Sequence, residues 1–190
     1  MKNLFSILMV LCFFIFNPVS ADDNLDTIKM FQNAGESANF FQTSYGYAVI
    51  PTIGKAGLGI GGAMGKGTVY EKGKAVGDTT MYQLSIGFQL GMQGYSEIIF
   101  FEDKRAFEDF TKGNFEFGAT AEAVAITAGV SASTSTAGNS AAASAGKNNA
   151  TTVGSGYKKG MAVFTIAKGG LMYEASIGGQ KFKYEPKQAK

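Results

Sequence analysis

Alternation of apolar and polar residues dominates the chain from Tyr45 onward and predicts β-structure. The clearest case is the segment 82–90, in which every second residue is a large apolar one. Its apolar side chains are expected to face the core. They are Tyr82, Leu84, Ile86, Phe88 and Leu90.

Further strands are expected at 47–53, 55–70, 95–101, 115–117, 161–167, 171–177 and 181–184. Glycine-containing dipeptides between these segments predict turns. The expected turns are at Lys72-Gly73-Lys74, Gly77-Asp78, Gly169-Gly170 and Gly178-Gly179. The Ala-rich segment 121–130 fits a strand or a helix.

Two segments have helical periodicity instead. In Asp22–Phe41 apolar residues recur every three or four positions, and the first three residues supply a cap. In Asp103–Lys112 a shorter apolar stripe ends at Gly113. The polar side of the first helix is not rich in Lys or Arg, which favours a helix docked on its own sheet over a membrane-surface helix. In the membrane alternative, Ile28, Phe31 and Phe41 would make the contact.

The pattern therefore predicts an α+β fold with one domain over 22–190. We expect a strongly bent, mostly antiparallel sheet, open or closed into a barrel, packed with an N-terminal helix and a short second helix. Glycine is abundant (26 residues) and lies within the alternating segments, which indicates tightly curved strands.

Residues 1–21 read as a signal peptide. Lys2 precedes an apolar run, Leu4–Phe16, and a small-residue ending, Val19-Ser20-Ala21. Cleavage after Ala21 would deliver the protein to the periplasm or outside the cell. Cys12 follows a large Leu, so we do not expect a lipoprotein. Residues 131–156 are a low-complexity segment of Ser, Thr, Ala, Gly and Asn, and are expected to form a flexible loop.

Composition restricts the chemistry. The chain has no His, and its one Cys lies in the expected signal peptide. A Ser-His-Asp triad, a Cys nucleophile and a His/Cys metal site are thereby excluded. The net charge of +2 is too small to indicate nucleic-acid binding. We expect a binding protein rather than an enzyme, without metal or cofactor.

Two enzyme-like motifs fail on context. Gly57, Gly59 and Gly62 satisfy G-x-G-x-x-G, but the residues that follow predict a strand instead of the required helix. Ser155 and Lys158 have the spacing of an acylating dyad, but they lie between a loop and a strand.

Several lysines lie beside glycine turns, where ammonium and backbone N–H groups can hold an anion. The alternative is ordinary solubilising lysine at strand ends. The candidates for anion binding are Lys55, Lys66, Lys158, Lys159 and Lys168.

Four segments in order resemble the SYLF domain family: YGYAVIPTIGKAGLGIGGAMGKGTVY, SIGFQLGMQGYSEIIFFED, GNFEFGA and GMAVFTIAKGGLMYEASIGGQKFKY. The chain is similar to short bacterial members with a signal peptide and one domain. The resemblance implies a non-enzymatic phospholipid-binding module, with an N-terminal helix that contributes in eukaryotic members and an association with actin in some fungal ones. It places headgroup contacts at Lys55, Lys66 and Lys168.

The expected function is therefore phospholipid membrane binding in the bacterial envelope, through anionic headgroups at Lys-Gly turns. The alternatives are a protein-interaction or envelope-structural module, with an envelope protein as partner, and a soluble periplasmic lipid carrier. The sequence does not indicate the oligomeric state.

Overall fold

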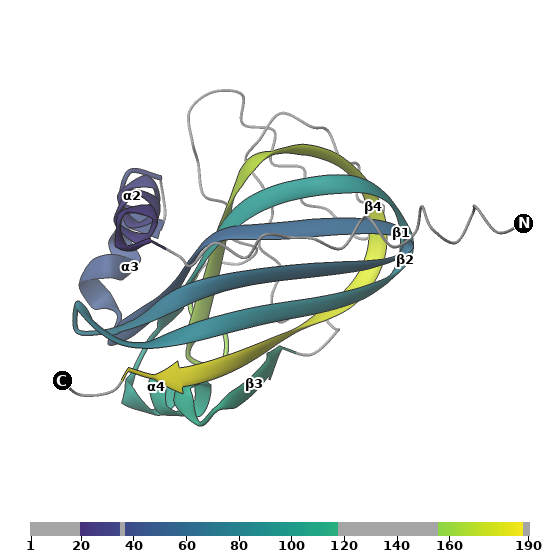
Figure 1. Ribbon diagram of the computed structural model, residues 1–190. Coiled ribbons are helices and arrows are strands. Elements are labelled where there is room, and N and C mark those ends of the chain that lie inside the picture. Colours follow the sequence, from purple (N-terminus) through teal and green to yellow (C-terminus); the bar gives the residue numbers. More distant parts are fainter. Residues whose placement is uncertain (1–19, 35–36, 118–155, 188–190) are drawn as a thin grey trace, which may run out of the picture.

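The computed structural model describes residues 20–34, 37–117 and 156–187. It confirms an α+β fold built on one antiparallel sheet with strand order β1-β2-β4-β3. The strands are β1 (Gly46–Glu71), β2 (Lys74–Phe101), β3 (Asn114–Phe117) and β4 (Met161–Pro186). The sheet is open and strongly curved (Figure 1).

Three of these strands are unusually long and bend in the middle. Each runs out along one limb of the sheet, turns at the bend and returns along the other limb (Figure 1). Register shifts mark the irregular points, including one between Leu58 and Ile60 of β1. We call residues 46–57 and 91–101, with the β4 residues paired to them, the first limb. Residues 61–71 and 74–85, with their β4 partners, form the second limb.

Glycine allows the two limbs to approach. A Cβ atom on Gly65 would lie 2.5 Å from Cγ1 of Ile53, and one on Gly67 would overlap the carbonyl oxygen of Val49. The second half of β1 thus folds back against its own first half, because these positions carry no side chain.

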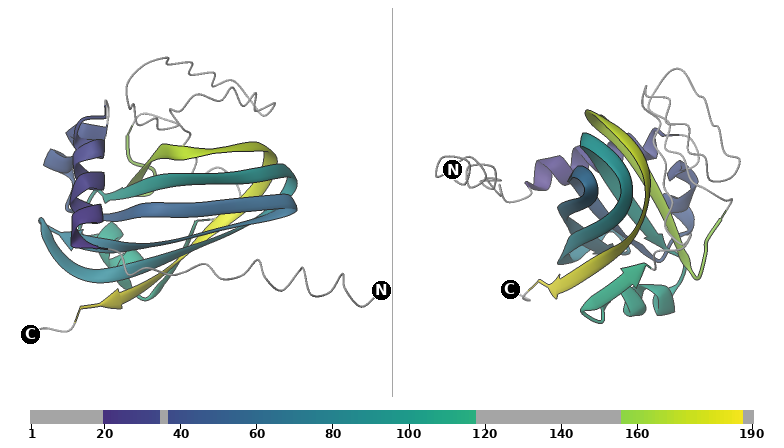
Figure 2. Two further views of the ribbon diagram at one scale, coloured as in Figure 1. Left: turned by 45° about the horizontal axis from the view of Figure 1, so that its top comes forward. Right: turned by 90° about the vertical axis from the view of Figure 1, so that its right-hand side faces the viewer.

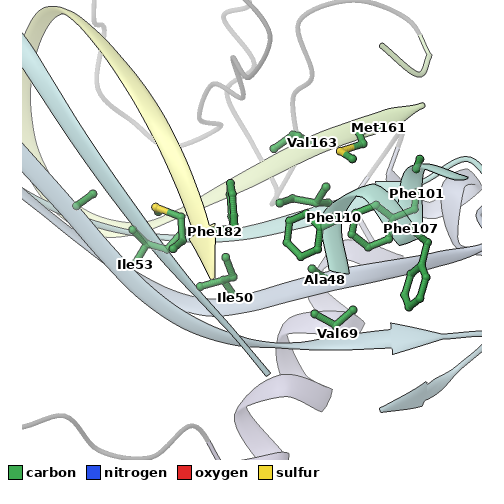
Figure 3. Packing of buried hydrophobic residues seen from close by; sticks show 14 residues of the cluster. Ala48, Ile50, Ile53, Val69, Phe101, Phe107, Phe110, Met161, Val163 and Phe182 are labelled. Atoms are coloured by element: carbon green, nitrogen blue, oxygen red, sulfur yellow. The ribbon is translucent and has the colours of Figure 1, made fainter. Parts of the chain in front are cut away.

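The concave side between the limbs holds the inner core. Its large members come from both limbs and from α4 (Lys104–Thr111), as Figure 3 shows. Ile50, Ile53, Phe101, Phe110 and Phe182 are among them. Asp103 caps α4 by accepting a hydrogen bond from the backbone N–H of Ala106 at 2.8 Å, so the second expected helix is confirmed.

Two helices pack on the outside of the sheet, at the end remote from the bend (Figure 2). They are α2 (Ala21–Gln32) and α3 (Ser37–Thr43). The expected N-terminal helix is confirmed, but it does not continue unbroken over Asp22–Phe41. The chain turns after Gln32, where the Asn33 amide bonds back to Lys29, and the Ser37 hydroxyl donates to the carbonyls of Phe31 and Ala34.

Some expected turns are also wrong. Lys72 and Gly73 do form a turn, with positive φ at both residues. Gly77-Asp78, Gly169-Gly170 and Gly178-Gly179 instead lie inside continuous strands. A side chain at Gly77 would overlap the Tyr184 ring, so glycine is needed there for packing and not for a turn. The segments 121–130 and 131–155 lie outside the described residues.

Candidate functional site

The outer surface of the bend carries five exposed apolar or aromatic side chains. Leu58 is 79% exposed, Ile60 65%, Leu84 64%, Met92 63% and Tyr82 42%. We call these five residues the apolar bend. They come from β1 and β2, whose register pairs Leu84 with Gly62, Tyr82 with Met64 and Met92 with Ala56. Scattered exposed apolar residues are ordinary, whereas a group on adjacent strands marks an interaction surface.

The inner surface of the sheet also carries polar side chains. Gln83, Tyr95, Glu97 and Gln180 form what we call the polar layer, and three of them pair in register with residues of the inner core, namely Gln83 with Ala63, Tyr95 with Ile53 and Glu97 with Ile50. The Tyr95 hydroxyl donates to Oε1 of Gln83 at 3.3 Å, and Nε2 of Gln180 donates to Oε2 of Glu97 at 3.0 Å. Ser85, also buried, continues the polar character along β2.

The sheet is therefore inverted near the bend. Elsewhere apolar side chains face the core, as expected for a sheet in water. Among the described residues of β2 beside the bend this is reversed, because Tyr82 and Leu84 face outward while Gln83 and Ser85 face inward. Such an inversion suits an outer surface that meets an apolar medium or partner.

The expected inward direction of Tyr82 and Leu84 is wrong for this reason. Alternation along β2 is real, but the inward positions are those of Gln83 and Ser85. The side chains of Ile86, Phe88 and Leu90 lie outside the described ones. Alternation shows that a strand has an apolar and a polar face, but it does not show which of the two faces the core. In this part of β2 the apolar face is the outer one.

Lys66 and Lys168 lie on the exposed surface on either side of the apolar bend. Lys66 is six residues beyond Ile60 on the second limb. On the first limb Lys168 donates from Nζ to Oγ1 of Thr52 at 3.1 Å, and Thr52 is six residues before Leu58. Lys55 is half-buried and pairs in register with Gln93.

Lys158 and Lys159 lie at the other end of the sheet. They belong to a turn that immediately precedes β4, and the Gly160 carbonyl of this turn accepts a hydrogen bond from the Glu102 backbone. The five candidate lysines are therefore not brought together: Lys55, Lys66 and Lys168 lie toward the bend, and Lys158 and Lys159 lie near α4.

The candidate membrane-contacting residues of the N-terminal helices pack against the sheet, Ile28 and Phe31 buried and Phe41 partly buried. Ile28 and Phe31 are buried in a cluster with Phe100 and Phe164 on the outside of the sheet. Phe41 packs edge-on against Phe100, with ring centroids 4.8 Å apart. A membrane contact through these residues requires the helices to leave the sheet, and it stays a prediction.

None of the helices in the described part of the chain is both long and apolar enough to cross a bilayer. Within the same residues, no three His, Cys, Asp or Glu side chains gather as a metal site would require. The feature that the arrangement offers is a surface, namely the apolar bend with lysines beside it.

Comparison with known proteins agrees with this picture of a binding domain. A family model described as Ysc84, "Las17-binding protein actin regulator", matches residues 82–188. The chain belongs to this family, which is the SYLF family. Its members are binding domains linked to regulators that bind lipid or actin.

One curated relative is the Beta cell expansion factor A of Aeromonas veronii. It is 29% identical to the chain over 157 residues, which cover 82% of this chain and 51% of the relative. The chain thus spans about half the length of that relative. No solved structure matches the chain significantly.

Proposed function

We propose that this SYLF protein is an exported, non-enzymatic protein of the bacterial envelope that binds anionic phospholipid membranes through the apolar bend. Family membership supports a binding role, and the signal-peptide pattern of residues 1–21 supports export. The observation that carries the proposal is the exposure of five apolar or aromatic side chains at the bend.

The apolar bend supplies the energy of attachment. Full burial of a Leu, Ile or Met side chain contributes about 1.5–3 kcal/mol. The side chains of the apolar bend stand on strands that are paired with their neighbours in the sheet. Little conformational entropy is therefore lost when they enter the acyl region.

Lys66 and Lys168 supply the preference for anionic lipid. A strand rises about 3.3 Å per residue, so Lys66 and the Thr52 partner of Lys168, each six residues from the bend, lie about 20 Å from it along the strand. One leaflet of hydrocarbon is about 15 Å thick. A bend inserted into one leaflet would therefore hold both ammonium groups at headgroup level, where each contributes about 1 kcal/mol.

Flotation of the protein with vesicles tests the proposal. Binding should be stronger to phosphatidylglycerol vesicles than to phosphatidylcholine vesicles, and salt should reduce that difference by screening the lysines. A double variant, Leu58→Ser with Ile60→Ser, should reduce the affinity about 100-fold, because it withdraws roughly 3 kcal/mol of apolar contact.

Leu25→Ser is the matched control. Leu25 is 52% exposed on α2, away from the bend, so its substitution should leave vesicle binding unchanged. An equal loss of vesicle affinity in the double variant and in Leu25→Ser would contradict the proposal, as would an unchanged affinity of the double variant. Absence of vesicle binding under all conditions would favour an envelope protein as the partner of the same surface.

A further inference from the structure

The polar layer joins the two limbs of the sheet. Tyr95 and Glu97 lie two residues apart on the first limb of β2. Gln83 and Gln180 are register partners on the second limb. The hydrogen bonds Tyr95–Gln83 and Gln180–Glu97 therefore cross the interior side by side, from one limb to the other.

Glu97 supplies the carboxyl group of this layer and is buried, with 1% of the residue exposed. Its Oε2 accepts from Nε2 of Gln180, while its Oε1 has no partner. Oε1 of Gln180 is also buried without a partner. Two acceptor oxygens, one from each member of the pair, are thus left without a hydrogen to bind.

The described residues around Glu97 supply no compensating charge. Its register partners are Ile50 on β1 and Thr165 on β4. Two titratable groups lie next along the strands. The Tyr95 hydroxyl is bonded to Gln83, and Lys55 pairs in register with Gln93, which is two residues from Tyr95 on β2. Among the described residues, no Lys or Arg forms an ion pair with Glu97.

One proton satisfies both oxygens. A carboxylic acid and a primary amide can form a closed ring of two hydrogen bonds, in which the amide N–H donates to one carboxyl oxygen and the acid O–H donates to the amide oxygen. An ionised Glu97 would instead be a buried charge with a single hydrogen bond, which is costly.

We propose that in mildly acidic solution Glu97 is protonated in the folded protein and that its acid group and the Gln180 amide clamp the two limbs together through paired hydrogen bonds. Loss of the proton to water removes one of these bonds and leaves a carboxylate in the interior. The folded sheet is therefore a proton-sensitive device. This inference concerns folding and does not depend on membrane binding.

The direction of the effect follows from the environment. Burial raises the pKa of Glu97 from the ordinary 4.5 to about 7, against the opposing effect of the Gln180 hydrogen bond. Between these two values the folded state holds a proton that the unfolded state has lost. The contribution of the clamp is complete below about pH 4.5, falls as the pH rises, and is lost above about pH 7.

Glu97→Gln is the decisive variant, because a Gln side chain can form the same two hydrogen bonds and cannot ionise. We would measure unfolding by denaturant for the wild type and the variant from pH 4 to pH 8. The ratio of their folding equilibrium constants should be constant below about pH 4.5. It should then change by up to about tenfold per pH unit in favour of the variant, and level off above pH 7. Glu116→Gln, at an exposed carboxylate paired with Lys181, is the control and should not produce this change.

Infrared spectroscopy tests the wild type directly. At pH 6 the exposed carboxyls are ionised, so a protonated-carboxyl band that disappears on titration to pH 8 reports a buried acid such as Glu97. The band should be absent from Glu97→Gln. If that variant fails to fold, the band in the wild type still tests the proposal. Absence of the band at pH 6, or parallel pH profiles for wild type and Glu97→Gln, would overturn it.

Discussion

Asn24 of α2 and Thr68 of β1, which are 44 residues apart, are joined by a buried hydrogen bond of 3.1 Å from Nδ2 to Oγ1. This contact fixes the N-terminal helix to the outside of the second limb. Thr68 in turn donates to Asp78 of β2, so the helix is bonded through one hydroxyl to two strands. The first helix is thus docked by a specific polar contact as well as by its apolar face.

The docked helix should contribute strongly to stability. Phe31 is fully buried under α2, so Phe31→Ala should lower the free energy of unfolding by about 3–5 kcal/mol. Leu25→Ala, at an exposed position of the same helix, should change it by less than about 0.5 kcal/mol. Denaturant unfolding compares the two. Similar small effects would show that the helix is not held by its apolar face.

The lysines beside the apolar bend should affect membrane binding selectively. Lys66→Gln with Lys168→Gln should weaken binding to anionic vesicles about 30-fold at low salt, because about 1 kcal/mol is lost per lysine. Lys158→Gln with Lys159→Gln removes the same charge near α4 and is the matched control. Equal losses in the two double variants would show that overall charge, and not the orientation of the bend, governs binding.

The approach of the two limbs depends on glycine at particular positions. Gly67→Ala would place a Cβ atom into the carbonyl oxygen of Val49, so it should destabilise the protein by about 3 kcal/mol. Gly54→Ala is the control, because a Cβ atom there would meet nothing within 4 Å. It should be neutral or slightly stabilising. Thermal unfolding of the two variants measures the difference, and a tolerant Gly67 would contradict the folded-back arrangement.

Tyr47 should ionise late in an alkaline titration. Burial, and the nearby Tyr70, raise the pKa of Tyr47 from 10 to about 12. The two rings stack with their centroids 5.0 Å apart. Since the folded state keeps its proton longer, this residue's contribution to stability is present below about pH 10 and is lost as the pH rises toward 12. Absorbance of tyrosinate measures the titration, and Tyr47→Phe should remove one late-ionising group. A titration in which all tyrosines ionise near pH 10 would contradict this.

The sequence predicted the class of fold because local patterns carry it. Alternation identified the strands, a short apolar stripe ending at Gly113 identified α4, and Lys72-Gly73 marked the hairpin turn. The lengths of the strands were not predictable in the same way. Gly169-Gly170 looks like a turn, yet in the structure it continues β4, because its neighbours on β2 supply the pairing that local propensity does not.

The candidate site was predicted only in part. Lysines beside glycines were visible in the sequence, but their separation into two groups depends on where the sheet bends. The apolar bend was missed because Leu84 was assigned to the core. The polar residues between its apolar positions, Gln83 above all, were the available signal. Only the first limb opposite Gln83, which supplies its partner Tyr95, shows that this side chain faces inward.

The length of the strands bears on how the chain folds. β1 and β2 meet first at neighbours of the Lys72-Gly73 turn, such as Glu71 and Lys74, so this hairpin can close rapidly and zip toward the bend. β4 must find β2 from far along the chain, as the pairing of Gly77 with Pro186 shows. We expect its arrival to be the slow step of folding. Until then the edge of β2 is an unpaired template, so it is the half-assembled hairpin, rather than the finished sheet, that is prone to aggregate.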